Sequence, residues 1–291
     1  MDKIYIVGGG ASGMMAAIQA KTKDNEIILL EKNDRVGKKI LATGNGKCNL
    51  GNENLSVDCY YSKNSSFVEQ VLKRYDTESA VSFFASIGLK VRSKNGYLYP
   101  YAEQASVVLD VLRMELERRS IQVKPGVQIT DCTPLINKRG YLLKTPDGRS
   151  YEADRVILAC GGPASLKEGG KDGYNILQKL GLKTYPLVPG LVQLRTDGKE
   201  QKALSGVRCK ASLRLFADGI QQGSEQGELQ LTDYGISGIP VFQLSRVAAY
   251  ALRNRKSVMV QIDFTPEYSY DEIVTYLLEQ QNLRKDQTVD E

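Results

Sequence analysis

The first 31 residues of the chain hold the feature that most limits how it can fold. A mostly apolar run, Lys3–Val7, predicts a buried strand, and the glycines that follow fit the pattern G-x-G-x-x-G. Met14–Lys21 continues as a predicted helix, and a second apolar run ends at the acidic residue Glu31. This order of strand, glycines, helix, strand and acid is typical of a βαβ unit that binds a dinucleotide.

Each part of this unit has a physical role in holding a dinucleotide. Gly8 permits the tight turn, Gly10 lets the backbone approach a pyrophosphate, and Gly13 lets helix and strand pack closely. The helix N-terminus offers free N–H groups, and Glu31 stands where a carboxylate accepts hydrogen bonds from a ribose. A glycine-rich turn alone has a purely structural interpretation, but all the parts occur here in order. We therefore predict a dinucleotide site.

A second glycine-rich segment follows, in which Gly37, Gly44 and Gly46 alternate with lysines. One interpretation is a surface loop whose lysines lie in water. The other is that the glycines bring backbone N–H groups close to a ligand and the lysines neutralise its phosphates. It is not a Walker A loop, because Lys47 is followed by Cys48 and not by Ser or Thr. FAD, which extends beyond the pyrophosphate, needs such a segment more than a nicotinamide cofactor does, so the sequence favours FAD.

Histidine is absent from the chain, which removes the usual acid–base residue and the Ser-His and Cys-His nucleophile schemes. Most catalytic metal sites also use histidine, and the five cysteines are scattered without a C-x-x-C pair. We therefore expect no metal site and no disulfide framework. The chemistry is expected to come from a redox cofactor, and no catalytic residue is assigned.

Composition and charge set the expected surroundings of the protein. No apolar run approaches the ~20 residues that cross a bilayer, and the chain enters a strand within three residues, which leaves no room for a signal peptide. With the cysteine usage, this predicts a cytoplasmic protein without a membrane segment. The net charge of +5 is spread along the chain with no aromatic–basic pattern, so we expect a small-molecule substrate and no nucleic-acid partner.

The rest of the chain predicts an α/β fold followed by a change of character. A helix over Glu103–Arg119 and a third parallel strand at Ile121–Val123 precede an antiparallel meander over residues 127–160. Arg155–Gly162 is predicted to be a buried strand that ends in a glycine pair and returns to the first βαβ unit, as such strands do in many FAD proteins. After residue 190, predicted strands at 191–195, 208–216, 228–231 and 257–263 alternate with polar loops and two helices.

Gly8–Gly13, Glu31-Lys32 and Thr43–Asn49 together resemble the bacterial NAD(P)/FAD-dependent oxidoreductases of the aminoacetone oxidase family, which includes the bile-acid reductase type. The pattern K-I-L-x-T/S-G-x-G-K/R-C-N is the more diagnostic part. The resemblance implies a Rossmann-like FAD-binding domain of the glutathione-reductase type, residues 1–190, and an inserted substrate domain of antiparallel strands plus helices, residues 191–291. It also implies ~100 further residues in full family members, so the inserted domain is expected to be incomplete.

The resemblance also implies which residues contact FAD. Val127 would lie against the adenine through its backbone, and Ala159, Gly161 and Gly162 would approach the cofactor from the returning strand. The remaining implied contacts are Gly8, Gly10, Ala11, Ser12, Gly13, Glu31, Lys32, Gly37, Lys38, Thr43, Gly44, Gly46, Cys48 and Asn49.

Leu231–Pro240 resembles the family motif F-T-H-Y-G-x-S-G-P, with Asp233 where His is commoner. The hydroxyls of Thr232, Tyr234 and Ser237 are expected either to face a substrate or to cap the helix that follows.

Three functions follow from these patterns. The leading one is an FAD-dependent oxidoreductase that passes hydride between the flavin and a small organic substrate, with NAD(P)H as a possible reductant. The chain has no second strand–GxGxxG–helix unit, so a resident NAD(P) domain is not expected. The alternatives are an NAD(P)-only dehydrogenase and a truncated, non-catalytic cofactor-binding protein. The substrate, the reductant and the oligomeric state are left open.

Overall fold

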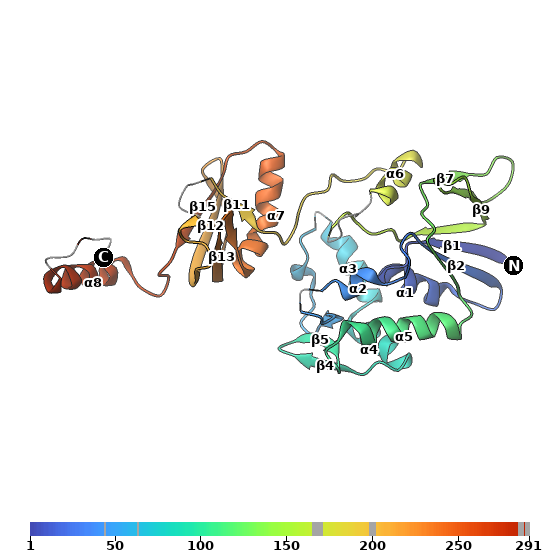
Figure 1. Ribbon diagram of the computed structural model, residues 1–291, viewed down its shortest axis with the longest axis horizontal. Coiled ribbons are helices and arrows are strands. Elements are labelled where there is room, and N and C mark those ends of the chain that lie inside the picture. The colour runs from blue at the N-terminus through green and yellow to red at the C-terminus, as the bar shows by residue number, and fades with distance from the viewer. Residues whose placement is uncertain (44, 63, 165–170, 198–201, 285–287, 289–291) are drawn as a thin grey trace. The chain divides into compact units, whose positions relative to one another are not determined.

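The computed structural model describes residues 1–43, 45–62, 64–164, 171–197, 202–284 and 288 (Figure 1). The chain forms two compact units, Met1–Thr184 and Tyr185–Glu291. The units therefore divide after Thr184, whereas the sequence predicted a boundary after Gly190. In the described part of the chain, no helix is both long and apolar enough to span a membrane.

A four-stranded parallel sheet forms the centre of the first unit. In sheet order its strands are β10 (Arg155–Leu158), β1 (Asp2–Val7), β2 (Asn25–Glu31) and β6 (Gln122–Pro125). The predicted third strand and the predicted returning strand are thereby confirmed. Parallel strands are covered on both faces, which is why β1 and β2 read as nearly continuous apolar runs.

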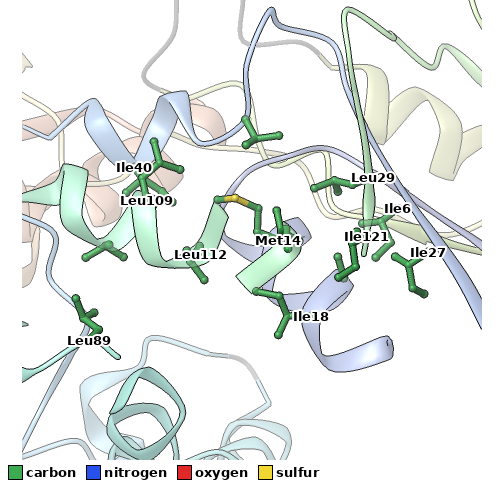
Figure 2. Close-up of a cluster of buried hydrophobic side chains, with 14 of the residues drawn as sticks. Ile6, Met14, Ile18, Ile27, Leu29, Ile40, Leu89, Leu109, Leu112 and Ile121 are labelled. Carbon is green, nitrogen blue, oxygen red and sulfur yellow. The ribbon is translucent and has the colours of Figure 1, made fainter. Parts of the chain in front are cut away.

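Helices α1 (Ala11–Ala20) and α5 (Ala105–Arg118) cover one face of this sheet. Alternate strand residues, such as Ile6 and Leu29, face these helices and pack with Met14 and Leu112 (Figure 2). The other face carries the intervening residues Tyr5, Val7, Ile28 and Leu30, which pack against the meander and α6 (Asp172–Lys179). The meander consists of β7 (Asp131–Pro134), β8 (Tyr141–Lys144) and β9 (Ser150–Ala153).

The meander was predicted to start at residue 127, but its first strand begins at Asp131. Residues 127–129 have no regular structure and do not pair as a strand. The chain between β2 and α5 contains short elements and a three-stranded sheet in the order β3-β5-β4. These elements are α2 (Lys38–Leu41), β3 (Gly51–Asn52), η1 (Val57–Cys59), α3 (Ser65–Arg74), α4 (Thr77–Ser86), β4 (Val91–Lys94) and β5 (Tyr97–Pro100).

The second unit contains a five-stranded antiparallel sheet in the order β11-β14-β13-β12-β15. Its elements are β11 (Leu194–Arg195), β12 (Arg208–Ala217), β13 (Ile220–Thr232), β14 (Gly235–Ser237), α7 (Ile239–Arg253), β15 (Val258–Asp263) and α8 (Tyr270–Leu283). Alternate residues of β12, such as Leu213 and Leu215, are fully buried and pack with Val241 and Leu244 of α7. The fold class and the strands of this unit agree with those predicted from the sequence, except that β13 is longer than the predicted strand at 228–231.

Candidate cofactor-binding site

A cavity of about 560 Å³ lies in the first unit where β1, β2 and β10 end. Ligands of α/β proteins bind at the carboxyl ends of parallel strands, and this volume is in the usual range for a cofactor pocket. Most of the predicted FAD contacts line it: Gly8, Gly10, Ala11, Ser12, Glu31, Lys32, Gly37, Lys38, Val127, Ala159, Gly161 and Gly162.

The turn between β1 and α1 has two glycines that the fold itself requires. Gly8 has a φ of +111°, and a Cβ there would overlap the carbonyl of Ala159. A Cβ on Gly13 would overlap the carbonyl oxygen of Gly8. Gly13 does not line the cavity; its role is to let α1 pack closely on the end of β1, as its position in the glycine pattern predicts.

Gly10 differs from both, since its φ is −79° and no atom lies within 4 Å of the position that its Cβ would take. Glycine is therefore not needed here for the fold, but its open side faces the cavity. Gly10 is also the N-cap of α1 and makes no side-chain cap bond. The first helical hydrogen bond runs from Met14 N to Gly10 O, so the amides of Ala11 and Ser12 have no partner within the helix.

Glu31 joins the two sides of this turn. Its carboxylate is buried and accepts hydrogen bonds from Gly9 N at 2.7 Å, Asn33 N at 2.8 Å and Asn33 Nδ2 at 2.5 Å. A carboxylate offers about four lone-pair positions, so about one remains for a ligand hydroxyl. The predicted contact with a ribose is thus compatible with a second role, which is to hold the glycine-rich turn in place.

The cationic side of the cavity comes from the chain after β2. Gly37 N donates to Gly9 O at 2.8 Å, which seats the start of α2 against the turn. Lys39 Nζ donates to the carbonyl of Gly162 at 2.8 Å, and Lys38 pairs with Asp34 at 2.6 Å. Lysines at this edge place positive charge where a pyrophosphate would lie.

The opposite side carries a small polar group around Asp172. Its carboxylate accepts from Gln128 Nε2 at 3.0 Å and lies 3.9 Å from Lys32 Nζ. Nearby, the thiol of Cys160 donates to Val7 O at 3.5 Å, and burial raises the pKa of this thiol above its ordinary value. Burial disfavours the thiolate form, and Cys160 is one of the residues that line the cavity.

Val127 is buried at the edge of the cavity, and its amide donates to Glu31 O at 2.9 Å. The N–H of Val127 is therefore already used. A backbone contact between Val127 and an adenine would have to use the carbonyl.

The second glycine-rich segment divides into two parts, because Gly37 and Lys38 line the cavity whereas the later stretch, Thr43–Asn49, behaves differently. Of its described residues, Thr43, Gly46, Cys48 and Asn49 do not line the cavity, and Gly44 lies outside the described residues. Gly46 O accepts from Ala105 N at 2.8 Å, so the segment anchors the start of α5. Asn49 Oδ1 accepts from Gly51 N at 3.0 Å within a local turn, and Cys48 packs against the core.

The side chain of Thr43 is the exception in this stretch. Its Oγ1 is buried and has no hydrogen-bond partner in the described part of the chain. A buried hydroxyl is normally satisfied, so this orphan is the atom of the segment that most favours the predicted contact with a ligand.

The predicted substrate hydroxyls lie in the second unit. Tyr234 Oη donates a hydrogen bond to Gln193 Oε1, and Arg195 Cζ lies 5.8 Å from the centre of the Tyr234 ring. Ser237 is buried at the end of β14, and α7 begins after Gly238 without a side-chain cap bond. The N-cap residue of α7 is thus Gly238 and none of the three hydroxyl residues. Thr232 Oγ1 is buried without a partner among the described residues.

Several residues that line the cavity were not predicted. Most of them are adjacent in sequence to a predicted FAD contact. The glycine pattern and the family resemblance therefore located the region of the cavity but did not identify every residue that lines it. A possible signal for Asp172 is the sequence Gly170-Lys171-Asp172-Gly173, an acid between glycines, whereas Gln128 and Ile129 had no local signal. The full set is Val7, Gly9, Leu30, Asn33, Lys39, Gln128, Ile129, Cys160 and Asp172.

These observations fit the ADP half of FAD. The open side of Gly10 and the first amides of α1, which have no partner within the helix, suit a pyrophosphate, and the remaining position on Glu31 suits a ribose hydroxyl. Val7, Leu30 and Ile129 also line the cavity, and their side chains belong to the buried core beneath it.

Comparisons with known proteins agree with this geometry. The chain matches the HI0933-like protein Rossmann domain over residues 2–237 and the HI0933-like protein barrel and H2TH domain over residues 188–291. It is 42% identical over 276 residues to a 3-dehydro-bile acid delta(4,6)-reductase of Clostridium scindens, which covers 94% of this chain and 67% of that protein. It is 26% identical over 273 residues to a ribosomal RNA dihydrouridine synthase of Haemophilus influenzae, which covers 92% and 65%.

Among solved structures, the open conformation of a flavocytochrome c3 fumarate reductase aligns with a TM-score of 0.45 and 15% identity, over 72% of this chain and 46% of that one. The chain spans about two thirds of the length of the two relatives described above. The Rossmann-domain match covers more than half of the chain, and the bacterial reductase is well above 30% identical. The chain therefore belongs to the HI0933-like family of FAD-dependent oxidoreductases.

Proposed function

We propose that this protein uses FAD to transfer hydride from NAD(P)H to a carbon–carbon double bond conjugated with a carbonyl group. The observation that carries the proposal is the cavity at the β1–α1 turn, where Gly10 is open, the first amides of α1 have no partner within the helix and Glu31 is fixed by Gly9. Together these groups fit the pyrophosphate and ribose of FAD. Bound FAD supplies the hydride chemistry, and the protein supplies binding and orientation.

The acceptor class is inferred from the chemistry of the relatives' names. A 3-dehydro-bile acid delta(4,6)-reductase saturates double bonds in a steroid that carries a 3-oxo group. A dihydrouridine synthase saturates a double bond in the uracil ring, which also carries carbonyl groups. The reaction proposed for this chain would consume NAD(P)H and one proton, release NAD(P)⁺ and convert C=C to CH–CH. We propose the same class for this chain and leave the particular molecule open.

The role of each unit follows from this proposal. The first unit would hold FAD, and the second would act as the inserted substrate domain, with the orphan hydroxyl of Thr232 and the ring of Tyr234 as candidate substrate contacts. NAD(P)H would bind transiently, since the sequence has one G-x-G-x-x-G unit, and this is used for FAD. The cysteines are free thiols in the structure, which suits a reducing compartment, so we propose a cytoplasmic location.

The test is an anaerobic titration of the full chain after FAD addition and desalting. We expect flavin absorbance to be retained, to be bleached by NADH or NADPH, and to return when a 4-ene-3-oxo steroid or cyclohexenone is added. The saturated ketone of each pair is the control and should leave the flavin reduced. Retained flavin that no reductant bleaches would favour a non-catalytic binding protein, and tight NADH binding without flavin retention would favour an NAD(P)-only dehydrogenase.

A further inference from the structure

The hairpin formed by β4 and β5 has one face that is basic and aromatic throughout. The register places Arg92 opposite Tyr99 and Lys94 opposite Tyr97. Residues directly opposite in a sheet project from the same face, so each cation lies beside a tyrosine. The turn between the strands is Asn95-Gly96, and both residues have positive φ, as a tight two-residue hairpin requires.

A third pair continues the pattern beyond the strand ends. Tyr101 N donates to Lys90 O at 2.8 Å, so these two residues are also opposite each other. Lys90 Nζ lies 4.9 Å from the centre of the Tyr101 ring, and Arg92 Cζ lies 5.7 Å from it. From outside the hairpin, Lys47 Nζ lies 6.0 Å from the Tyr99 ring. These distances are those of cation–π contacts.

The intervening residues of the hairpin form its inner face. Leu98 and Pro100 are buried, whereas Tyr97 is 49% exposed and Tyr101 57% exposed. The core therefore explains Leu98 and Pro100 but does not require the tyrosines. Exposed aromatic rings interleaved with cations are the pattern found on surfaces that bind single-stranded nucleic acid.

Glu103 supplies a carboxylate to this face. It pairs with Lys47 and Arg92 and lies 4.0 Å from Lys94. One carboxylate against the cations of Lys47, Lys90, Arg92 and Lys94 leaves a net positive charge, and its pairs hold two of the cations in place. The face therefore remains suited to an anionic partner.

We propose that this face, defined by Lys47, Lys90, Arg92, Lys94, Tyr97, Tyr99 and Tyr101, binds single-stranded RNA. Unpaired bases stack on aromatic rings, and the intervening phosphates pair with Lys and Arg. Successive tyrosines on one face of a strand are roughly 6.8 Å apart, a spacing that an extended single strand can follow. Tyrosine hydroxyls and cationic donors can also reach a ribose 2′-hydroxyl. A duplex hides its bases and fits this face less well.

The proposal is independent of the flavin chemistry, and it revises one sequence expectation. A nucleic-acid partner was not expected because no aromatic–basic pattern was recognised. The stretch from Lys90 to Tyr101 contains that pattern, but it becomes visible only when the hairpin places the cationic run beside the tyrosine run.

The test measures fluorescence anisotropy of a labelled 12-nucleotide single-stranded RNA with the full chain, over a range of NaCl concentrations. We expect K90Q/R92Q/K94Q to weaken binding at least ten-fold and to reduce the slope of log K against log salt by about 2, since each lost phosphate contact removes about 0.7. We expect Y97L/Y101L to weaken binding about five-fold or more with little change in slope, because stacking is not electrostatic.

Matched controls separate this face from general surface charge. K138Q/R139Q/K144Q removes the same charges from exposed positions of the β7–β8 hairpin, and Y75L/Y185L removes two exposed rings elsewhere. Both should change affinity less than three-fold. K90R/K94R preserves charge and should retain binding, and far-UV circular dichroism checks the fold of every variant.

Several results would overturn the proposal. One is that K90Q/R92Q/K94Q and K138Q/R139Q/K144Q weaken RNA binding equally. Others are that an abasic oligomer binds as tightly as the RNA, or that a duplex or single-stranded DNA of the same sequence binds more tightly. Binding of phosphatidylserine vesicles without binding of RNA would also overturn it. Flavin reduction is not part of this readout, so loss of the proposed enzyme activity would leave the result unaffected.

Discussion

Two glycine-rich stretches of the first unit, Gly8–Gly13 and Thr43–Asn49, have similar compositions but different roles in the structure. In Gly8–Gly13, the glycines form one wall of the cavity or allow α1 to approach β1. In Thr43–Asn49, the described residues turn away from the cavity, and Gly46 O holds the start of α5 through Ala105. Glycine content alone therefore does not identify a ligand contact. What distinguishes Gly8 and Gly10 from Gly46 is that they line the cavity.

The largest expected contrast between the segments is in stability. Gly13→Ala places a Cβ on the carbonyl oxygen of Gly8, so we expect a loss of about 3 kcal/mol in the free energy of unfolding. Gly46→Ala meets no neighbouring atom and suffers only from its φ of +67°, so it should cost about 1 kcal/mol. Urea unfolding followed by circular dichroism measures both. Equal losses would show that the two turns are under the same constraint.

The next effect concerns the carboxylate that fixes the first segment. Glu31→Gln replaces an acceptor oxygen by an NH₂ group that would face backbone N–H donors of Gly9 or Asn33. We expect a loss of about 2 kcal/mol in stability together with weaker FAD binding. Glu26→Gln, on the same strand but exposed and paired only with Lys3, is the control and should stay within about 0.5 kcal/mol. A stable Glu31→Gln variant would mean that the carboxylate does not hold the turn.

A smaller effect separates ligand contact from folding within the first segment. Gly10→Ala adds a Cβ that meets no protein atom, so stability should change by less than about 0.5 kcal/mol. The same methyl group enters the cavity, so the dissociation constant for FAD should rise about ten-fold, which is about 1.4 kcal/mol. Isothermal titration calorimetry measures the affinity, with Gly51→Ala as a control outside the cavity. Unchanged FAD affinity would remove Gly10 from the site.

The smallest expected effect tests whether the second segment contacts FAD at all. Thr43→Val removes a buried hydroxyl that has no partner among the described residues, so stability should be equal or slightly higher. If this hydroxyl bonds FAD, affinity should fall about three-fold, or about 0.65 kcal/mol. Thr77→Val, which breaks the bond from Thr77 Oγ1 to Asn52 O, should lower stability and leave FAD affinity unchanged. An unchanged affinity in Thr43→Val would leave this segment a purely structural role.

The sequence predicted the parts of the fold that depend on local patterns. Apolar periodicity gave β1, β2, α5 and the meander, and the spacing of Gly8, Gly10 and Gly13 gave the turn between β1 and α1. These features follow from residues that are neighbours in the chain, because a positive φ or a close helix–strand contact has to be accommodated locally. The region of the cavity could be located for the same reason.

The parts that could not be predicted depend on distant partners. Ile220–Gly227 is polar and lacks alternation, but it forms the first half of β13 because it pairs with β12. The direction of the chain after α2 is set by contacts such as that of Gly46 with Ala105, which no local pattern reports. Gln128 and Ile129 reach the cavity only because β6 delivers the chain to that edge of the sheet.

The place of β10 beside β1 has a consequence for how the protein is made. The register joins Val7 to Leu158, so one neighbour of the first strand is translated long after the strand itself. On the ribosome, β1, α1 and β2 can associate early, but the wall that contains Ala159 and Gly161 is added only when β10 emerges. The cavity is therefore complete only after that strand has paired, and any ligand that binds the complete cavity stabilises chains in which this late pairing has occurred.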